Sequence, residues 1–264
     1  MHKNLTVVRG GGDLATGTIH RLVRCGFNVI VLEVEKPTVI RRTVAFAQAV
    51  FDGETTVEGI QAVRTDGMEQ VMKTLDEKRV PVLVDPSGMS INGLKPEIVV
   101  DATIVKRNLG TYKDMASIVI GLGPGFTAGE DVHAVVETNR GHDLGRVIYN
   151  GSAEPDTGNP GKIEGYGRER IIRAPVAGLI QTKAKIGNSV KKGDVVAFVD
   201  DTPVFAPLDG VLRGLIQQGL IVESQFKIGD VDPRNKPEYC FTISDKARAV
   251  AGGVLEAILH LRSK

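Results

Sequence analysis

The first residues of the chain combine two hydrophobic spacings. Leu5–Val8 is a short, mostly apolar run of β-favouring residues, which indicates a buried strand, and three glycines follow at Gly10, Gly11 and Gly12. From Ala15 to Val23 the apolar positions recur at helical spacing, and Phe27–Leu32 is again a mostly apolar run that indicates a strand. The pattern therefore predicts a strand, a glycine turn, a helix and a second strand.

The same alternation continues to about residue 149. Short apolar runs at 60–64, 80–84, 98–102, 117–120 and 132–136 predict further strands, and residues 68–75 have helical spacing. Buried strands that alternate with helices are typical of a parallel sheet covered by helices. We therefore expect an α/β fold, with a Rossmann-like nucleotide- or cofactor-binding domain over residues 1–149.

The pattern changes in the second half. Residues 150–168 are rich in Gly, Pro, Asp and Asn, which predicts a linker loop. Ala174-Pro175 and Gly178 recur as Ala206-Pro207 and Gly210, an offset of 32 residues. Two similar halves of short strands predict a small β domain with pseudo-twofold symmetry over 169–243. Residues 244–264 predict a C-terminal helix that packs on the sheet or on a second copy of the chain, which leaves a homo-oligomer open.

Composition excludes several classes of partner. The chain has 264 residues, is 42% hydrophobic and has a net charge of +1, so neither nucleic acid nor a membrane surface is an expected partner. No apolar run is long enough to span a membrane, and no signal peptide is expected. The two cysteines, Cys25 and Cys240, form no disulfide framework, which favours a cytoplasmic protein.

The glycine turn carries the strongest candidate chemistry. Gly10-x-Gly12-x-x-Ala15 matches a dinucleotide-binding pattern, and Glu33 lies 23 positions after Gly10, where an acid can bind a ribose hydroxyl. Asp13 opens the helix, whose exposed amides favour an anion. We expect Gly10, Gly11, Gly12, Asp13 and Glu33 to bind a phosphate-bearing ligand. The alternative is that the glycines only form a tight turn.

Other expected strand ends add charge and glycine to the same edge. The candidate cofactor-binding residues there are Arg41, Asp101, Lys106, Arg107, Gly121, Gly123 and Gly125. The basic residues suit a phosphate and the glycines could enclose one side of a ligand. A solvated pair at Arg41-Arg42 and a rigid turn at 121–125 are the structural alternatives.

No metal site and no catalytic residue is predicted. His133 and Glu137 are four residues apart, but the valines between them indicate a strand, on which these side chains are distant neighbours. Cys25 and Cys240 are in apolar surroundings typical of inert core thiols, although sulfur transfer through a cysteine is a third reading.

The β half resembles biotinyl and lipoyl domains, through Ala174–Gly178 and Val190-Lys191-Lys192-Gly193-Asp194. Such carrier domains attach their group to a lysine at the tip of a hairpin. The expected tip here, 198–203, has no lysine, so neither biotin nor lipoate is expected.

The whole chain resembles the accessory-protein family encoded with selenium-dependent molybdenum hydroxylases. The resemblance rests on the segments 8–17, 32–37, 41–46, 101–110, 120–126 and 227–234. The first half is also similar to xanthine dehydrogenase accessory factors. The resemblance implies a maturation factor that binds molybdenum cofactor and docks on a hydroxylase subunit. An NAD(P)-dependent oxidoreductase with a β-domain lid is the alternative, which the absence of a Tyr-x-x-x-Lys pair disfavours.

Overall fold

A computed structural model describes residues 4–156, 158 and 161–264. The chain divides into two compact units. Unit 1 comprises residues 1–37, 45–157 and 243–264, and unit 2 comprises residues 38–44 and 158–242. The expected linker 150–168 is divided between the units, and its residues 157, 159 and 160 lie outside the described residues, as do residues 1–3.

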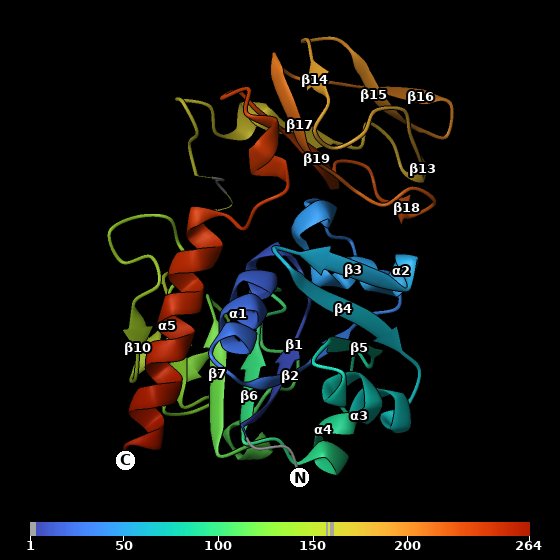
Figure 1. Cartoon of the computed structure of the whole chain (residues 1–264). Helices are drawn as coiled ribbons and strands as arrows, with labels where there is room; N and C mark the ends of the chain where they lie inside the picture. Colours follow the sequence, from blue (N-terminus) through green and yellow to red (C-terminus); the bar gives the residue numbers. More distant parts are fainter. Residues whose placement is uncertain (1–3, 157, 159–160) are drawn as a thin grey trace. The chain divides into compact units, whose positions relative to one another are not determined.

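Unit 1 is built on a nine-stranded sheet with the order β10-β9-β7-β6-β1-β2-β5-β4-β3 (Figure 1). The strands are β1 (Leu5–Arg9), β2 (Asn28–Glu33), β3 (Glu54–Val57), β4 (Ile60–Thr65), β5 (Val80–Val84), β6 (Ile98–Asp101), β7 (Ile118–Leu122), β9 (Ala134–Val136) and β10 (Val147–Ile148). A separate pair is formed by β8 (Thr127–Ala128) and β11 (Gly151–Ser152).

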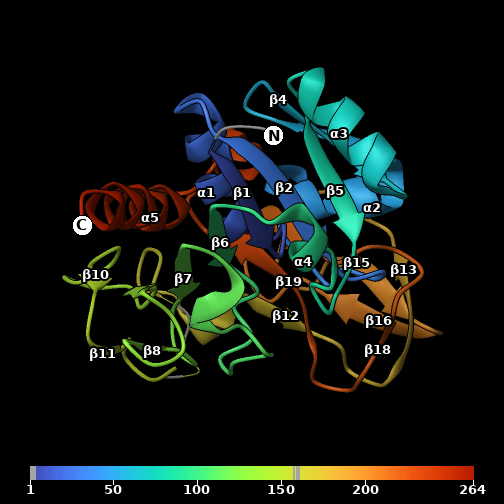
Figure 2. The same cartoon turned by 90° about the horizontal axis from the view of Figure 1, so that it is seen from below.

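Five helices and two short 3-10 turns complete unit 1. They are α1 (Asp13–Arg24), α2 (Ala49–Asp52), α3 (Met68–Asp76), α4 (Ser90–Leu94), α5 (Asp245–Arg262), η2 (Phe46–Gln48) and η3 (Lys113–Met115). Helix α5 lies beside α1 in both views, where Gly17 of α1 leaves room for Ala247 (Figures 1 and 2). The core includes the fully buried residues Val7, Ile30 and Val99 of three adjacent strands. Among the described residues, no helix is both long and apolar enough to cross a membrane.

Unit 2 contains two four-stranded antiparallel sheets, β12-β19-β17-β14 and β16-β15-β13-β18. Its strands are β12 (Ile171–Arg173), β13 (Gly178–Thr182), β14 (Ser189–Val190), β15 (Val195–Val199), β16 (Thr202–Phe205), β17 (Gly210–Leu215), β18 (Ile221–Val222) and β19 (Lys227–Asp232), with turns η1 (Arg42–Val44), η4 (Arg168–Arg170) and η5 (Pro237–Cys240).

The predicted repeat is confirmed by the topology of unit 2. The four strands of the first half, β12 to β15, correspond in order to the four strands β16 to β19 of the second half. When each strand is replaced by its counterpart, the strand order of one sheet becomes the strand order of the other. The first residues of β13 and β17, Gly178 and Gly210, have the same φ of +157°. In both, an added Cβ would collide with an aspartate, Asp200 or Asp232.

The predicted fold class is wrong in its arrangement. The large sheet is mixed and not parallel, because its outer strands β3 and β10 pair antiparallel with β4 and β9. A Rossmann-like domain followed by a biotinyl- or lipoyl-like barrel-sandwich is likewise not what the chain forms. Unit 2 consists of two antiparallel sheets and takes residues 38–44 from the first half, while α5 belongs to unit 1. Short hairpins and an inserted segment have little hydrophobic periodicity, so the sequence pattern did not reveal them.

Candidate functional site

The candidate site lies at the carboxyl ends of β1 and β6. From β1 the chain continues to β2 on one side of β1, and it later returns to the other side of β1 as β6. The adjacent parallel strands β1 and β6 therefore form a topological switch point. Ligands of open α/β sheets bind outside the strands at such a point. The glycine turn 10–12 follows β1, and Ala102-Thr103 follows β6.

The three glycines of the turn have different roles. Gly10 has a φ of +89°, and a Cβ there would lie 3.0 Å from the Ala102 carbonyl oxygen, so this residue allows β1 and the segment after β6 to approach. A Cβ on Gly11 would lie 2.8 Å from the Ala47 nitrogen, which itself donates to the Gly11 carbonyl. Gly11 is therefore packed against the protein's own backbone at Ala47.

Gly12 is the N-cap of α1 and leaves the helix start without a side-chain cap. Its backbone is extended, with φ −62° and ψ 177°, so the residue is not required for a left-handed turn. Asp13 lies in the first turn. Amides at a helix start carry partial positive charge and can bind an anion.

Glu33 holds the glycine turn in place. Its two carboxylate oxygens accept hydrogen bonds from the backbone nitrogens of Gly11, at 2.7 Å, and Val34, at 2.8 Å. The side chain is buried, and burial raises the pKa of the carboxyl above its ordinary value despite these two bonds. The acid expected to bind a ribose hydroxyl thus has its oxygens engaged by the loop itself.

Asp101 belongs to a buried polar network under the site. It accepts hydrogen bonds from the Thr111 hydroxyl at 2.5 Å and from the Thr103 hydroxyl at 2.7 Å. Arg9 forms an ion pair with Asp101 at 3.4 Å and donates to Thr111. Arg9 was not singled out in the sequence, because its role depends on the neighbouring position of β6. The network fastens both ends of the loop 102–111 to the sheet.

This loop has unusual backbone geometry. Ile104 has a φ of +57° and Lys106 of +66°. Positive φ is a genuine outlier for a β-branched residue such as isoleucine, and such conformations concentrate at functional sites. The exposed Lys106 forms an ion pair with Asp156 at 2.6 Å.

The second glycine loop, 121–125, packs against the loop 102–111. A Cβ on Gly125 would lie 2.7 Å from the Arg107 nitrogen, so the structure brings Gly125 to the backbone of the 106–107 pair. Gly121 leaves room for Phe126, and Gly123 for the Thr138 side chain. These glycines allow close packing within the loop.

Lys246 is a site residue that the sequence did not reveal. This half-buried residue is in the first turn of α5. Burial lowers the pKa of its ammonium group, with Asp13 as the strongest opposing charge and Arg140, Glu137 and Asp156 also acting on it. Lys246 and Asp13 are 233 positions apart in the sequence, and only the packing of α5 beside α1 brings them near each other.

Arg41 belongs to unit 2. Its guanidinium donates to the carbonyl oxygens of Tyr239, at 3.0 Å, and Thr242, at 3.2 Å. The other candidate residues, in the turn 10–13, at Glu33 and Asp101, and in the loops 106–107 and 121–125, are in unit 1.

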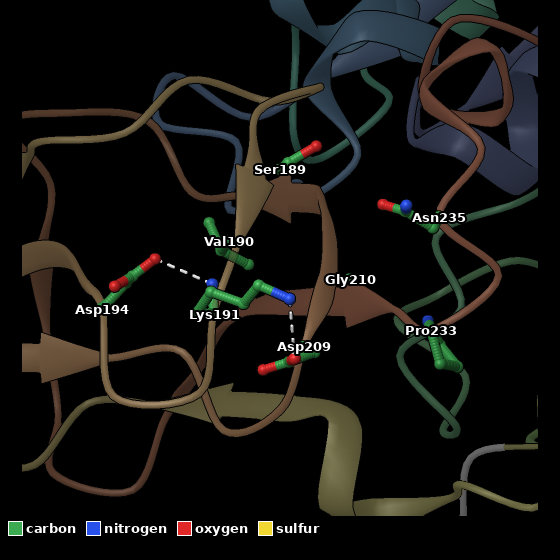
Figure 3. A pocket seen from close by; sticks show the side chains of 8 residues that line it. All are labelled: Ser189, Val190, Lys191, Asp194, Asp209, Gly210, Pro233 and Asn235. Atoms are coloured by element: carbon green, nitrogen blue, oxygen red, sulfur yellow. Dashed lines mark hydrogen bonds and ion pairs between the residues drawn. The ribbon is translucent and has the colours of Figure 1, made fainter.

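A separate open hollow of about 460 Å³ is found in unit 2 (Figure 3). Lys191 and Asp209 lie on its wall and form an ion pair at 3.0 Å, and the Lys191 backbone nitrogen donates to Asp194 (Figure 3). Both charged side chains are well exposed, so they compensate each other in solvent and create no strong field. Asp194 is the remaining charged residue that lines the hollow, and its carboxylate accepts the Lys191 amide.

The metal and thiol alternatives can be placed in the structure. Within the described part of the chain, no three His, Cys, Asp or Glu residues are grouped to hold a metal ion. His133 accepts a hydrogen bond from the Val119 nitrogen at 3.0 Å, and burial lowers its pKa. Cys25 is exposed, whereas Cys240 is buried and burial raises the pKa of its thiol.

Comparison with known proteins gives one strong sequence match. No family model matches the chain. The uncharacterized protein YqeB of Escherichia coli K12 is 55% identical over 257 residues, which cover 97% of this chain and 48% of that protein. The chain therefore spans about half the length of this curated relative.

Similarity to solved structures is weak. The ectoine utilization protein EutE of Ruegeria pomeroyi in its product-bound form aligns at 11% identity over 86% of this chain and 56% of its own, with a TM-score of 0.23. An aspartoacylase family protein of Mesorhizobium loti aligns at 9% over 81% and 59%, with a TM-score of 0.24. A succinylglutamate desuccinylase/aspartoacylase of Rhodobacter sphaeroides aligns at 15% over 88% and 86%, with a TM-score of 0.27. Alignments at this level carry no conclusion about activity.

These comparisons correct the family prediction. Two of the solved structures are described as aspartoacylase or desuccinylase proteins and one as an ectoine utilization protein, and none of the proteins reported above is described as a molybdenum hydroxylase accessory protein. The expected membership of that family is therefore wrong on these findings, and with it the maturation role.

Proposed function

We propose that unit 1 binds a small molecule that carries a phosphate group, such as a nucleotide, at the carboxyl ends of β1 and β6. The observation that carries the proposal is the start of α1 at the switch point, with no side-chain cap at Gly12. Amides at a helix start form the positive end of the helix dipole and favour an anion.

One buried cation lies near the helix start. Lys246 is half-buried, and its ammonium group interacts with the carboxylates of Asp13, Glu137 and Asp156 and with the guanidinium of Arg140. A partly desolvated ammonium gains more from an anionic partner than an exposed one does. The backbone conformation at Ile104 is a third indication, since unfavourable backbone is retained where a site requires it.

The proposed ligand contacts differ from those of a dinucleotide fold. Glu33 and Gly11 are engaged with each other, so the turn offers Gly12 and the residues after it to the phosphate.

We also propose the cytoplasm as the compartment, because the exposed free thiol of Cys25 suits a reducing environment.

Calorimetric titration with AMP and with adenosine tests the proposal. We expect AMP to bind, adenosine to bind at least about tenfold more weakly, and Lys246→Gln to weaken AMP binding by about tenfold, or 1.4 kcal/mol. Arg248→Gln removes a cation from the same helix that is exposed and paired with Glu58, and should leave AMP affinity unchanged. Equal affinity for AMP and adenosine, or equal effects of the two substitutions, would overturn the phosphate assignment.

A further inference from the structure

Lys106 and Asp156 form an exposed ion pair in unit 1 that the proposed function does not yet use. The Lys106 ammonium donates to the Asp156 carboxylate at 2.6 Å, and the two side chains are 51% and 38% exposed. Exposed ion pairs contribute little to stability, because solvent screens them. Since solvent reaches both groups, a ligand can meet the Lys106 ammonium without a buried cavity.

The backbone at Lys106 is packed in place. A Cβ on Gly125 would lie 2.9 Å from the Lys106 carbonyl carbon, so the loop 121–125 packs directly against this peptide. Lys106 has a φ of +66°, a left-handed conformation that costs a lysine free energy and is retained where the surrounding structure requires it. Lys106 is therefore an exposed cation on a well-supported backbone.

A buried carboxylate supports the chain just before Asp156. Glu137 is 3% exposed, and its two oxygens accept the backbone nitrogens of Asn139, at 2.6 Å, and Glu154, at 2.8 Å. The neighbouring Ala153 is buried as well. The chain is thus anchored two residues before Asp156, which holds this carboxylate near Lys106.

Asp156 also connects Lys106 to the start of α1. Its charge acts on the Lys246 ammonium, on which Asp13 acts more strongly. Asp13 is in the first turn of α1, at the helix start that the proposed function uses. The two lysines therefore share Asp156 as a neighbouring anion, and the Lys106–Asp156 pair belongs to the charged surroundings of that helix start.

From this geometry we propose that Asp156 is a resident anion that occupies Lys106 until the phosphate group of the ligand replaces it, so that Lys106 is a further phosphate-binding residue. The inference rests on the function proposed for unit 1. A phosphate monoester carries about two negative charges near neutral pH, whereas the Asp156 carboxylate carries one. The phosphate therefore attracts Lys106 and Lys246 more strongly than Asp156 does, and the exchange breaks only an exposed pair.

Calorimetric titration of AMP into four variants of the full chain tests the exchange. Lys106→Gln should weaken AMP binding about fivefold, and Asp156→Asn should strengthen it about fivefold, because Lys106 is then released for the ligand. In the Lys106→Gln background, Asp156→Asn should have much less effect, since both changes act through one contact. Asp209→Asn is the matched control: it removes the carboxylate of a similar exposed pair with Lys191, at 3.0 Å in unit 2, and should keep wild-type affinity.

The other outcomes separate the exchange from simpler explanations. An equal gain from Asp156→Asn with and without Lys106 would indicate general repulsion of the ligand by Asp156 and overturn the exchange. AMP binding that Lys246→Gln weakens but that Lys106→Gln and Asp156→Asn leave unchanged would overturn the exchange and keep the function proposed for unit 1. Absence of AMP binding in both wild type and Asp156→Asn would overturn that function, and the exchange with it.

Discussion

At the residue scale, burial decides what each polar group of the glycine turn can do. Glu33 is at the end of β2 in a position that suits ribose binding, yet its oxygens accept the Gly11 and Val34 amides. Gly10 needs a positive φ and contact with Ala102, whereas Gly12 has an ordinary extended backbone. Gly10 is therefore explained by its positive φ and Gly11 by its contact with Ala47, whereas the backbone of Gly12 does not require a glycine.

Glu33 should make the stability of the protein depend on pH. Burial raises the pKa of Glu33 in the folded protein above its value in the unfolded chain, which is near 4.5. The stability that Glu33 contributes is therefore fully present below the unfolded pKa and is lost as pH rises through the folded pKa. We expect the difference in free energy of unfolding between wild type and Glu33→Gln to shrink as pH rises from 4.5. Urea unfolding of both proteins at a series of pH values measures this difference. A difference that is constant or grows with pH would contradict the shift.

At the element scale, α5 is fixed by small residues on its inner side. Gly253 lies against the backbone of Gly145 and the side chain of Val136, and Ala247 lies against Gly17 of α1. A Cβ added to the adjacent Gly252 would lie near only the flexible end of the Arg21 side chain, at 3.3 Å. Each of the two glycines weakens the helix, and the packing shows that only Gly253 is needed for close contact.

The two adjacent glycines should therefore respond in opposite directions to alanine. Gly253→Ala places a methyl group on the Gly145 carbonyl and should destabilise unit 1 by about 1–3 kcal/mol. Gly252→Ala should stabilise it by about 0.5–1 kcal/mol, because alanine is the better helix former. Denaturant unfolding midpoints of the two variants give the comparison, and equal effects would contradict the observed packing.

At the scale of the whole molecule, the two units exchange segments of chain. Residues 38–44 leave unit 1 and lie against β17, where the Leu215 nitrogen donates to the Ile40 carbonyl at 2.9 Å. The Arg42 guanidinium donates to the Leu215 carbonyl at 2.7 Å. Gly214 is required there, because a Cβ would lie 2.5 Å from Ile40. The inserted segment thus completes one half of the repeat.

Gly214→Ala should displace this segment. We expect the overpacking to lower the free energy of unfolding by about 1–3 kcal/mol. Hydrogen exchange at the Leu215 amide should also become faster. Thr182 is the equivalent position in the other half, and Thr182→Ala should cost less than about 1 kcal/mol, since its exposed hydroxyl bonds only Gln218. Unchanged exchange at Leu215 in Gly214→Ala would show that the segment is not held through this contact.

The sequence by itself determined the local elements and the repeat. Its hydrophobic spacing was enough to locate α1, α5 and most strands of the large sheet, since periodicity records which face of an element is buried. The offset of 32 residues was enough to predict two equivalent halves in unit 2.

Tertiary structure decided everything that depends on neighbours distant along the chain. Packing produces the mixed edges of the sheet and the transfer of residues 38–44 to unit 2. It also brings Lys246 near Asp13 and pairs Arg9 with Asp101. A single position in the sequence records the polarity and size of its own side chain. It does not record which backbone amide or carboxylate the fold places beside that side chain, and those partners set the charge, hydrogen bonding and role of each site residue.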